Sequence, residues 1–144
     1  MNQQQLPNMY SLTAIGIATF LGSALAAGYM LSANYAALGQ KRMGQYALVG
    51  SILVVLAFIF LPTQFAPNLT TAIVFMIAQV MIVLAIANKL QGPMFKSFEE
   101  MGGKYHPMRR AVLVGVVASL VLTFTWVALV LLITGGSPPP PAAT

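Results

Sequence analysis

Residues 111–134, AVLVGVVASLVLTFTWVALVLLIT, decide the fold class, because no residue in this stretch is charged. A helix that crosses a bilayer needs about 20 mainly apolar residues, since the hydrocarbon is roughly 30 Å thick and a helix rises about 1.5 Å per residue. Gly135 and Gly136 follow, and then a run of prolines, so the stretch ends sharply. The sequence therefore predicts a transmembrane helix here.

Three further apolar stretches are free of charge, at Leu12–Ala33, Tyr46–Leu61 and Leu69–Asn88. Pro62, Pro67 and Pro93 stand between the later stretches, where a missing N–H and a fixed φ mark helix ends. We therefore expect an all-α integral membrane protein with four transmembrane helices, in one transmembrane domain over residues 12–134. Residues 1–11 and 135–144 form the two tails, the second of them rich in proline.

The composition agrees with this class of protein. Of 144 residues, 58% are hydrophobic and 6% are charged, whereas a soluble domain has about 25% charged residues. Nine charges cannot cover a soluble surface of this size, so a soluble fold is excluded. The absence of cysteine excludes disulfides, thiolate metal ligands and a cysteine nucleophile.

All seven basic residues lie in two predicted loops. Lys41 and Arg42 are in loop 34–45, and the other five are in loop 89–110. By the positive-inside rule both loops face the cytoplasm, and both tails then face outward. A cleaved signal sequence is the alternative for the first span, but residues 1–11 lack the basic residues with which such signals begin.

The second basic loop has its own helical pattern. Gly92-Pro93 opens it, and Met94, Phe95, Phe98 and Met101 share one face of a helix. This predicts a short amphipathic helix in the membrane interface, with basic residues beside anionic lipid headgroups. The expected lipid or partner contacts are Lys41, Arg42, Lys96, Phe98, Lys104, Arg109 and Arg110.

Polar and small residues within the spans are candidates for helix packing or for a polar path. Gln79 lies in the middle of the third span, and Ser23 and Thr123 lie in the first and the fourth. An amide in hydrocarbon needs a partner, either a neighbouring helix or a solute in a pore. Gly22 and Ala26 have the small-xxx-small spacing that lets helix backbones approach closely.

Ionisable residues are absent from the predicted spans. Proton-coupled transporters, rotary rings and voltage sensors depend on such groups, so these classes are excluded. One histidine, His106, and two adjacent acids, Glu99 and Glu100, cannot assemble three or four metal ligands or a catalytic set. We expect no enzyme activity and no cofactor, and these three side chains are expected to be solvated.

An internal repeat is the next pattern to consider. Ala33-Asn34 followed by Gly39 parallels Ala87-Asn88 followed by Gly92, and similar short matches continue into the second and fourth spans. Duplication of a helical hairpin and chance recurrence of common residues both explain these matches.

Two short motifs carry a family resemblance. Asn34-Tyr35-Ala36-Ala37-Leu38-Gly39 follows the first span, and Gln91-Gly92-Pro93 precedes the loop helix. Together, over about residues 25–110, they resemble small four-helix inner-membrane proteins of bacteria. The resemblance implies a bacterial cytoplasmic membrane and four helices, and it implies no activity.

The function that these observations favour is that of a non-enzymatic accessory or assembly subunit of a larger membrane complex. It would act through helix packing and a basic cytoplasmic loop. Its expected partners are the lipid bilayer, anionic headgroups and other membrane subunits or copies of itself, without nucleic acid. A small oligomeric channel or transporter and an immunity protein against a membrane-acting toxin are the alternatives. The immunity proteins of this size with four helices keep their termini in the cytoplasm, unlike the expectation here.

Overall fold

A computed structural model describes residues 6–60 and 68–135 of the chain. Its helices are α1 (Leu12–Ala37), α2 (Lys41–Phe60), α3 (Leu69–Glu100) and α4 (Met108–Thr134). Each is long and apolar enough to cross a membrane. The prediction of an all-helical chain with four such helices is therefore confirmed. The C-terminal tail after residue 135 lies outside the described residues, as do residues 1–5 and the connection 61–67.

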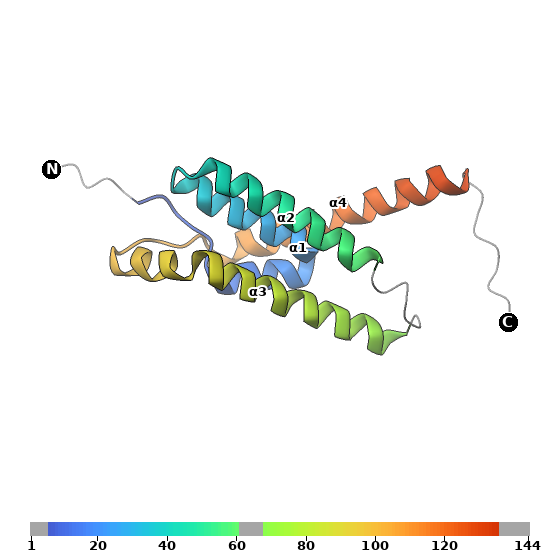
Figure 1. The fold of residues 1–144 in the computed structure, drawn as a ribbon, viewed down its shortest axis with the longest axis horizontal. Coiled ribbons are helices and arrows are strands. Elements are labelled where there is room, and N and C mark those ends of the chain that lie inside the picture. Colours follow the sequence, from blue (N-terminus) through green and yellow to red (C-terminus); the bar gives the residue numbers. More distant parts are fainter. Residues whose placement is uncertain (1–5, 61–67, 136–144) are drawn as a thin grey trace.

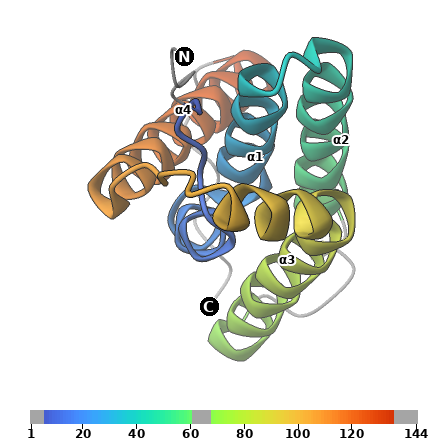
Figure 2. The same cartoon turned by 90° about the vertical axis from the view of Figure 1, so that its left-hand side faces the viewer.

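Helix α1 folds back on itself. Gly22 and Ser23 leave the helical conformation, and Ser23 has φ 64° and ψ −173°. A straight helix of 26 residues would hold its ends about 39 Å apart. Instead, the Tyr10 N–H donates to Asn34 Oδ1 at 2.7 Å, and Asn34 Nδ2 donates to the Tyr10 carbonyl at 2.9 Å. The arms 12–21 and 24–37 thus form a V, visible as the two blue segments in Figures 1 and 2.

This bend changes the expected position of the N-terminal tail. The Met9 N–H donates to the Lys104 carbonyl at 3.3 Å, and the His106 N–H donates to the Met9 carbonyl at 2.8 Å. The end of the tail therefore lies at the same end of the bundle as the basic loop. The charge pattern predicted that the two lie on opposite sides, because a straight first span would carry the chain from one side to the other. By the rise of an α-helix, the two arms of α1 are about 15 and 21 Å long.

Helix α1 is the centre of the bundle. Helices α2, α3 and α4 each pack on α1, and among the described residues they contact one another little. The close approaches use glycine: a Cβ on Gly22 would lie 2.8 Å from the Gly115 Cα of α4, and a Cβ on Gly28 would collide with Ser51 of α2. Ala26 is fully buried. The small residues of α1 are therefore used within the chain.

Helix α3 is longer than the predicted third span. It continues from Leu69 through Pro93 to Glu100, so the expected separate amphipathic helix is the last part of α3. Pro93 removes one N–H and bends a helix without ending it here, and Figure 2 shows the yellow end of α3 turning away from its green part. Gly102, at φ 74°, then allows the chain to leave the helix.

The two halves of the chain differ in form. In the first half α1 is folded into a V, whereas in the second half α3 runs on through 32 residues. The repeat suggested by the sequence is therefore not matched by equivalent hairpins. The predicted loops are also shorter than expected, because α2 begins at Lys41 and α4 at Met108.

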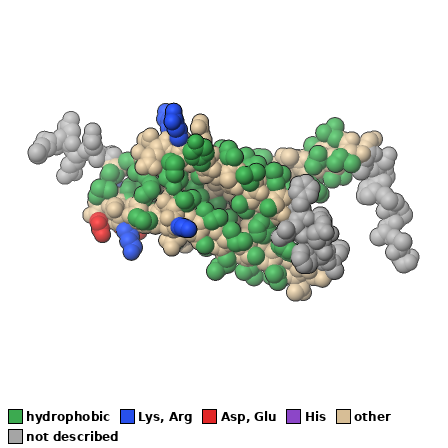
Figure 3. Space-filling model, viewed as in Figure 1, with side chains coloured by type: hydrophobic (Ala, Val, Ile, Leu, Met, Phe, Trp, Pro, Cys, Tyr) green, Lys and Arg blue, Asp and Glu red, His purple; other side chains and the backbone are tan. Residues whose placement is uncertain are grey.

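The charges lie toward one end of the bundle. In Figure 3 the blue and red side chains on the visible face are at the left, and the rest of that face, apart from the grey residues, is apolar or uncharged. Lys41 and Arg42 occupy the first turn of α2, and Arg109 and Arg110 occupy the first turn of α4. We call this region the basic end, and the region around residues 60, 69 and 134 the far end.

Candidate functional site

Two buried amides join three segments at the basic end. Asn34 of α1 and Gln91 of α3 are both fully buried, and Asn34 Nδ2 donates to Gln91 Oε1 at 3.0 Å. Gln91 Nε2 in turn donates to the Leu31 carbonyl at 3.2 Å. With the two bonds between Asn34 and Tyr10, every polar atom of this amide pair has a partner. Buried amides that are fully satisfied fix one arrangement of the segments they join.

Residues 6–11, which we call the N-terminal segment, are also held by side chains of the 101–107 loop. The Tyr10 ring lies against the His106 ring, with centroids 4.6 Å apart, and Met9 is fully buried. Arg110 Nη1 lies 2.9 Å from His106 Nδ1. Because a guanidinium only donates, Nδ1 accepts this bond and the imidazole is neutral. Burial and then the Arg110 charge lower the pKa of His106 below its usual value.

Phe98 differs from its predicted role. It is 2% exposed and lies under Gly103 and Tyr105, whose ring centroid is 5.4 Å away. It therefore belongs to the core at the basic end and does not offer a lipid or partner contact. The Tyr105 hydroxyl donates to Glu99 Oε1 at 3.0 Å, and burial together with this bond raises the pKa of Tyr105 to about 12.

The six basic side chains predicted as contacts are exposed, and they lie on different elements of the bundle. Two lie on α2, one on α3, one in the 101–107 loop and two on α4. They are Lys41, Arg42, Lys96, Lys104, Arg109 and Arg110. Their shared position at one end of the bundle suits a charged surface better than a single binding pocket.

A second feature lies on the bend of α1, and we call it the bend cleft. It is a cavity of about 330 Å³ lined by Ser23, Val55, Phe58, Ile59, Gln79, Leu122, Thr123 and Trp126. All four helices contribute to it. Ser23, Gln79 and Thr123, which the sequence analysis selected as polar candidates from three separate spans, thus share one cavity.

The polar side chains of the bend cleft are largely unpaired. Within the described part of the chain, the side chains of Gln79, Thr123 and Trp126 make no hydrogen bond, whereas Thr125 on the same helix donates to the Val121 carbonyl at 2.7 Å. Ser23 Oγ accepts a bond from the Leu25 N–H at 3.3 Å. The cleft therefore offers several free donors beside apolar and aromatic walls.

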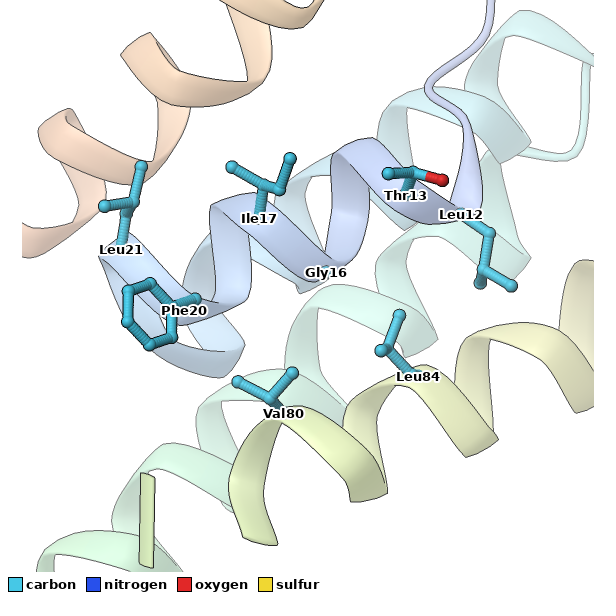
Figure 4. Close-up of a pocket in the computed structure, with 8 residues that line it drawn as sticks. All are labelled: Leu12, Thr13, Gly16, Ile17, Phe20, Leu21, Val80 and Leu84. Atoms are coloured by element: carbon cyan, nitrogen blue, oxygen red, sulfur yellow. The ribbon is translucent and has the colours of Figure 1, made fainter. Parts of the chain in front are cut away.

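Two other grooves are almost entirely apolar. One, of about 480 Å³, lies between the first arm of α1 and α3. Figure 4 shows Leu84 of α3 facing Gly16, with Phe20 and Val80 nearby. The other, of about 270 Å³, lies between α2 and α3 over the second arm of α1. Neither groove gathers polar side chains from several helices, so neither matches the bend cleft as a site.

Sequence reasoning did not assign a role to Asn34 and Gln91. Both belong to the two motifs that carried the family resemblance, and the structure brings these motifs into direct contact. The position of both amides near the ends of predicted spans was the signal that could have indicated their role. Their pairing, however, depends on how the helices pack. Within residues 6–60 and 68–135, no three His, Asp or Glu side chains gather where they could hold a metal ion.

The fold and the site define a class, a four-helix chain whose helices are long and apolar enough to cross a membrane, with a mainly apolar cleft at a helix bend that contains several polar side chains. Comparisons of the chain with known protein families, characterised proteins and solved structures each find no match.

Proposed function

We propose that this chain is a non-enzymatic accessory or assembly subunit of a membrane complex, placed in the cytoplasmic membrane of a bacterium. Its basic end would face the cytoplasm, as the positive-inside rule requires. The N-terminal segment, which is hydrogen-bonded to the basic loop, would then lie on the cytoplasmic side. The C-terminal end of α4 would face outward.

The observation that supports the subunit role is the exposure of the second half of α4. Beyond Ala118, no described side chain of this helix is buried, and Phe124 and Leu132 are 70% and 81% exposed. In Figure 1 the red end of α4 stands away from the other helices. A lone helix in lipid gains van der Waals contact and hydrogen bonds when it packs on another helix. The face of α4 around Phe124 and Leu132 is therefore the surface on which a partner would pack.

Photocrosslinking in cells tests this role. A photoreactive phenylalanine analogue at Phe124 is expected to give a heavier product, whereas the same analogue at Tyr29, which is also half-exposed, is not. A product of twice the mass would make the partner a second copy of the chain. If Phe124 gives no product and the chain purifies in mild detergent as a lone monomer, the subunit role is wrong.

The proposed orientation has its own test. A periplasm-active reporter after Thr144 should be active, and the same reporter before Met1 should be inactive. Activity at both ends would favour the orientation in which each terminus faces outward, and would contradict the proposed cytoplasmic N-terminus.

A small channel or transporter is the second candidate, because Ser23, Gln79 and Thr123 share one cavity. Gly22, next to Ser23 in the chain, is packed against Gly115 of α4. Solute flux in proteoliposomes that persists in Gln79→Leu and Ser23→Ala would exclude these residues as its lining.

A further inference from the structure

The bend cleft lies at the depth of the bilayer centre if the helices cross the membrane as proposed above, and the following inference rests on that placement. Gln79 is ten residues from Leu69 and ten residues from Lys89 along α3. At about 1.5 Å per residue, it lies about 15 Å from each, or half of a hydrocarbon layer of roughly 30 Å. Beside the cleft, the Gly22 backbone meets Gly115 of α4.

The side chains of the cleft define what it can bind. The Trp126 indole N–H only donates, the Thr123 hydroxyl has its proton free, and the Gln79 amide offers two further donors. Phe58 and Leu122 supply aromatic and aliphatic walls. A matching ligand therefore has acceptor oxygens on a compact apolar body. The apolar walls disfavour a site filled with water. Donors without partners in hydrocarbon are costly, so a ligand with acceptor oxygens would stabilise the cleft.

The depth narrows the class of ligand. Phospholipid ester groups lie in the interfacial region, so their carbonyl oxygens do not reach the bilayer centre. A lipid-soluble quinone does reach it, and it carries two carbonyl oxygens on a flat ring with an apolar tail. A ring of this kind fits a cavity of about 330 Å³ and can stack on the aromatic side chains.

We propose that the bend cleft binds a lipid-soluble quinone. The ring lies between α3 and α4 with its carbonyl oxygens accepting from Gln79, Thr123 or Trp126. The tail leaves through the open side of the cleft, where Trp126 is 52% exposed. The backbone of Ser23, at φ 64°, is in a region that residues other than glycine rarely adopt, and such strain is concentrated at ligand sites.

The chain contains a natural reporter for this site, because Trp126 is its single tryptophan. The experiment adds decyl-ubiquinone to the purified full-length protein in detergent micelles and follows tryptophan emission, corrected for quinone absorption. We expect saturable quenching. Gln79→Leu or Thr123→Val should weaken the apparent affinity by roughly three- to thirty-fold, the range for one hydrogen bond inside a membrane protein.

Two controls make the outcome decisive. Thr125→Val, on the same helix but outside the cleft lining, should leave the affinity unchanged. Decylbenzene, which has the tail without the carbonyl oxygens, should not displace the quinone. Quenching without saturation, a parent-like affinity in both cleft variants, or a loss equally large in Thr125→Val overturns the proposal.

The fold and the subunit role are tested separately. Gln79 makes no hydrogen bond in the described chain, so its replacement should not unfold the protein, and circular dichroism checks this. Because the titration uses the purified chain alone, it gives the same answer whether or not Phe124 crosslinks to a partner. Failure of one proposal is thus distinguishable from failure of the other.

Discussion

Replacing Asn34 by leucine is expected to release the N-terminal segment from the bundle. Asn34 makes two hydrogen bonds with the Tyr10 backbone and one with Gln91, at 2.7, 2.9 and 3.0 Å. Leucine has a similar size but supplies none of them. The substitution also leaves the Tyr10 N–H and Gln91 Oε1 buried without these partners, and unpaired buried groups are costly.

The size of the effect follows from these contacts. A hydrogen bond inside a protein contributes about 0.5–1.5 kcal/mol net, so the two bonds that join Asn34 to the Tyr10 backbone amount to about 1–3 kcal/mol. Since 1.4 kcal/mol corresponds to a factor of ten, the fraction of molecules with a detached segment should rise roughly 5- to 140-fold.

A single cysteine measures this opening directly, because the chain has none of its own. In Met9→Cys the thiol is placed where Met9 is 0% exposed, so a maleimide reacts only when the segment detaches. Leu6→Cys, at a position that is 36% exposed, gives the rate for an accessible thiol under the same conditions. The ratio of the two rates reports the open fraction.

The expected result is slow labelling at position 9 in the parent and a strong increase after Asn34→Leu. Gln91→Leu should give a smaller increase, because it leaves both bonds between Asn34 and the Tyr10 backbone in place and removes only the bonds of Gln91 to Asn34 and Leu31. If labelling at position 9 stays slow in Asn34→Leu while circular dichroism shows intact helices, the amide pair does not hold the segment and the reasoning is refuted.

Three further predictions follow from other contacts. Gly22→Leu places side-chain atoms against the Gly115 backbone and should lower the free energy of unfolding in a detergent titration by about 1–3 kcal/mol, whereas Gly50→Ala, with no atom within 4 Å of its new Cβ, should not lower it. The lowered pKa of His106 means that its imidazole binds a proton more readily when the N-terminal segment is detached. Attachment should therefore be strongest above pH 6.5 and weaken as the pH falls below it. Labelling at position 9, normalised to position 6, should increase as the pH is lowered from 8 to 5, and a flat profile would contradict this. Tyr105 should ionise near its pKa of about 12 by absorbance titration, and Glu99→Gln should lower that value, since the carboxylate charge favours the protonated phenol.

Much of the architecture followed from properties that are local to a few residues. Residues 111–134 and the three other apolar stretches predicted four helices, because about 20 uncharged residues suffice to identify a span. Prolines and glycines indicated most helix ends. Pro93 was an exception: α3 continues through it, because packing of Phe95 and Phe98 in the core holds the helix together beyond the missing N–H.

The candidate site was predictable in its parts but not in its arrangement. Gln79, Ser23 and Thr123 stood out as polar residues in apolar spans, yet nothing in their spacing indicated that they line one cavity. Phe98 fitted an exposed amphipathic face by periodicity and is buried instead, because the N-terminal segment and the 101–107 loop cover that end of the bundle. Helical periodicity identifies an apolar face without identifying what packs on it.

The sequence by itself determined the class of protein, four apolar helices with the basic residues confined to two regions, because hydrophobicity and charge add up residue by residue. Only the tertiary structure decided that α1 bends at Gly22 and Ser23. No proline or charge marks that bend. It depends on the contact between Gly22 and Gly115 and on the hydrogen bonds between Asn34 and Tyr10, which are 24 residues apart. Contacts between distant residues form only in the folded chain, and here they place the N-terminal segment at the basic end and create the bend cleft.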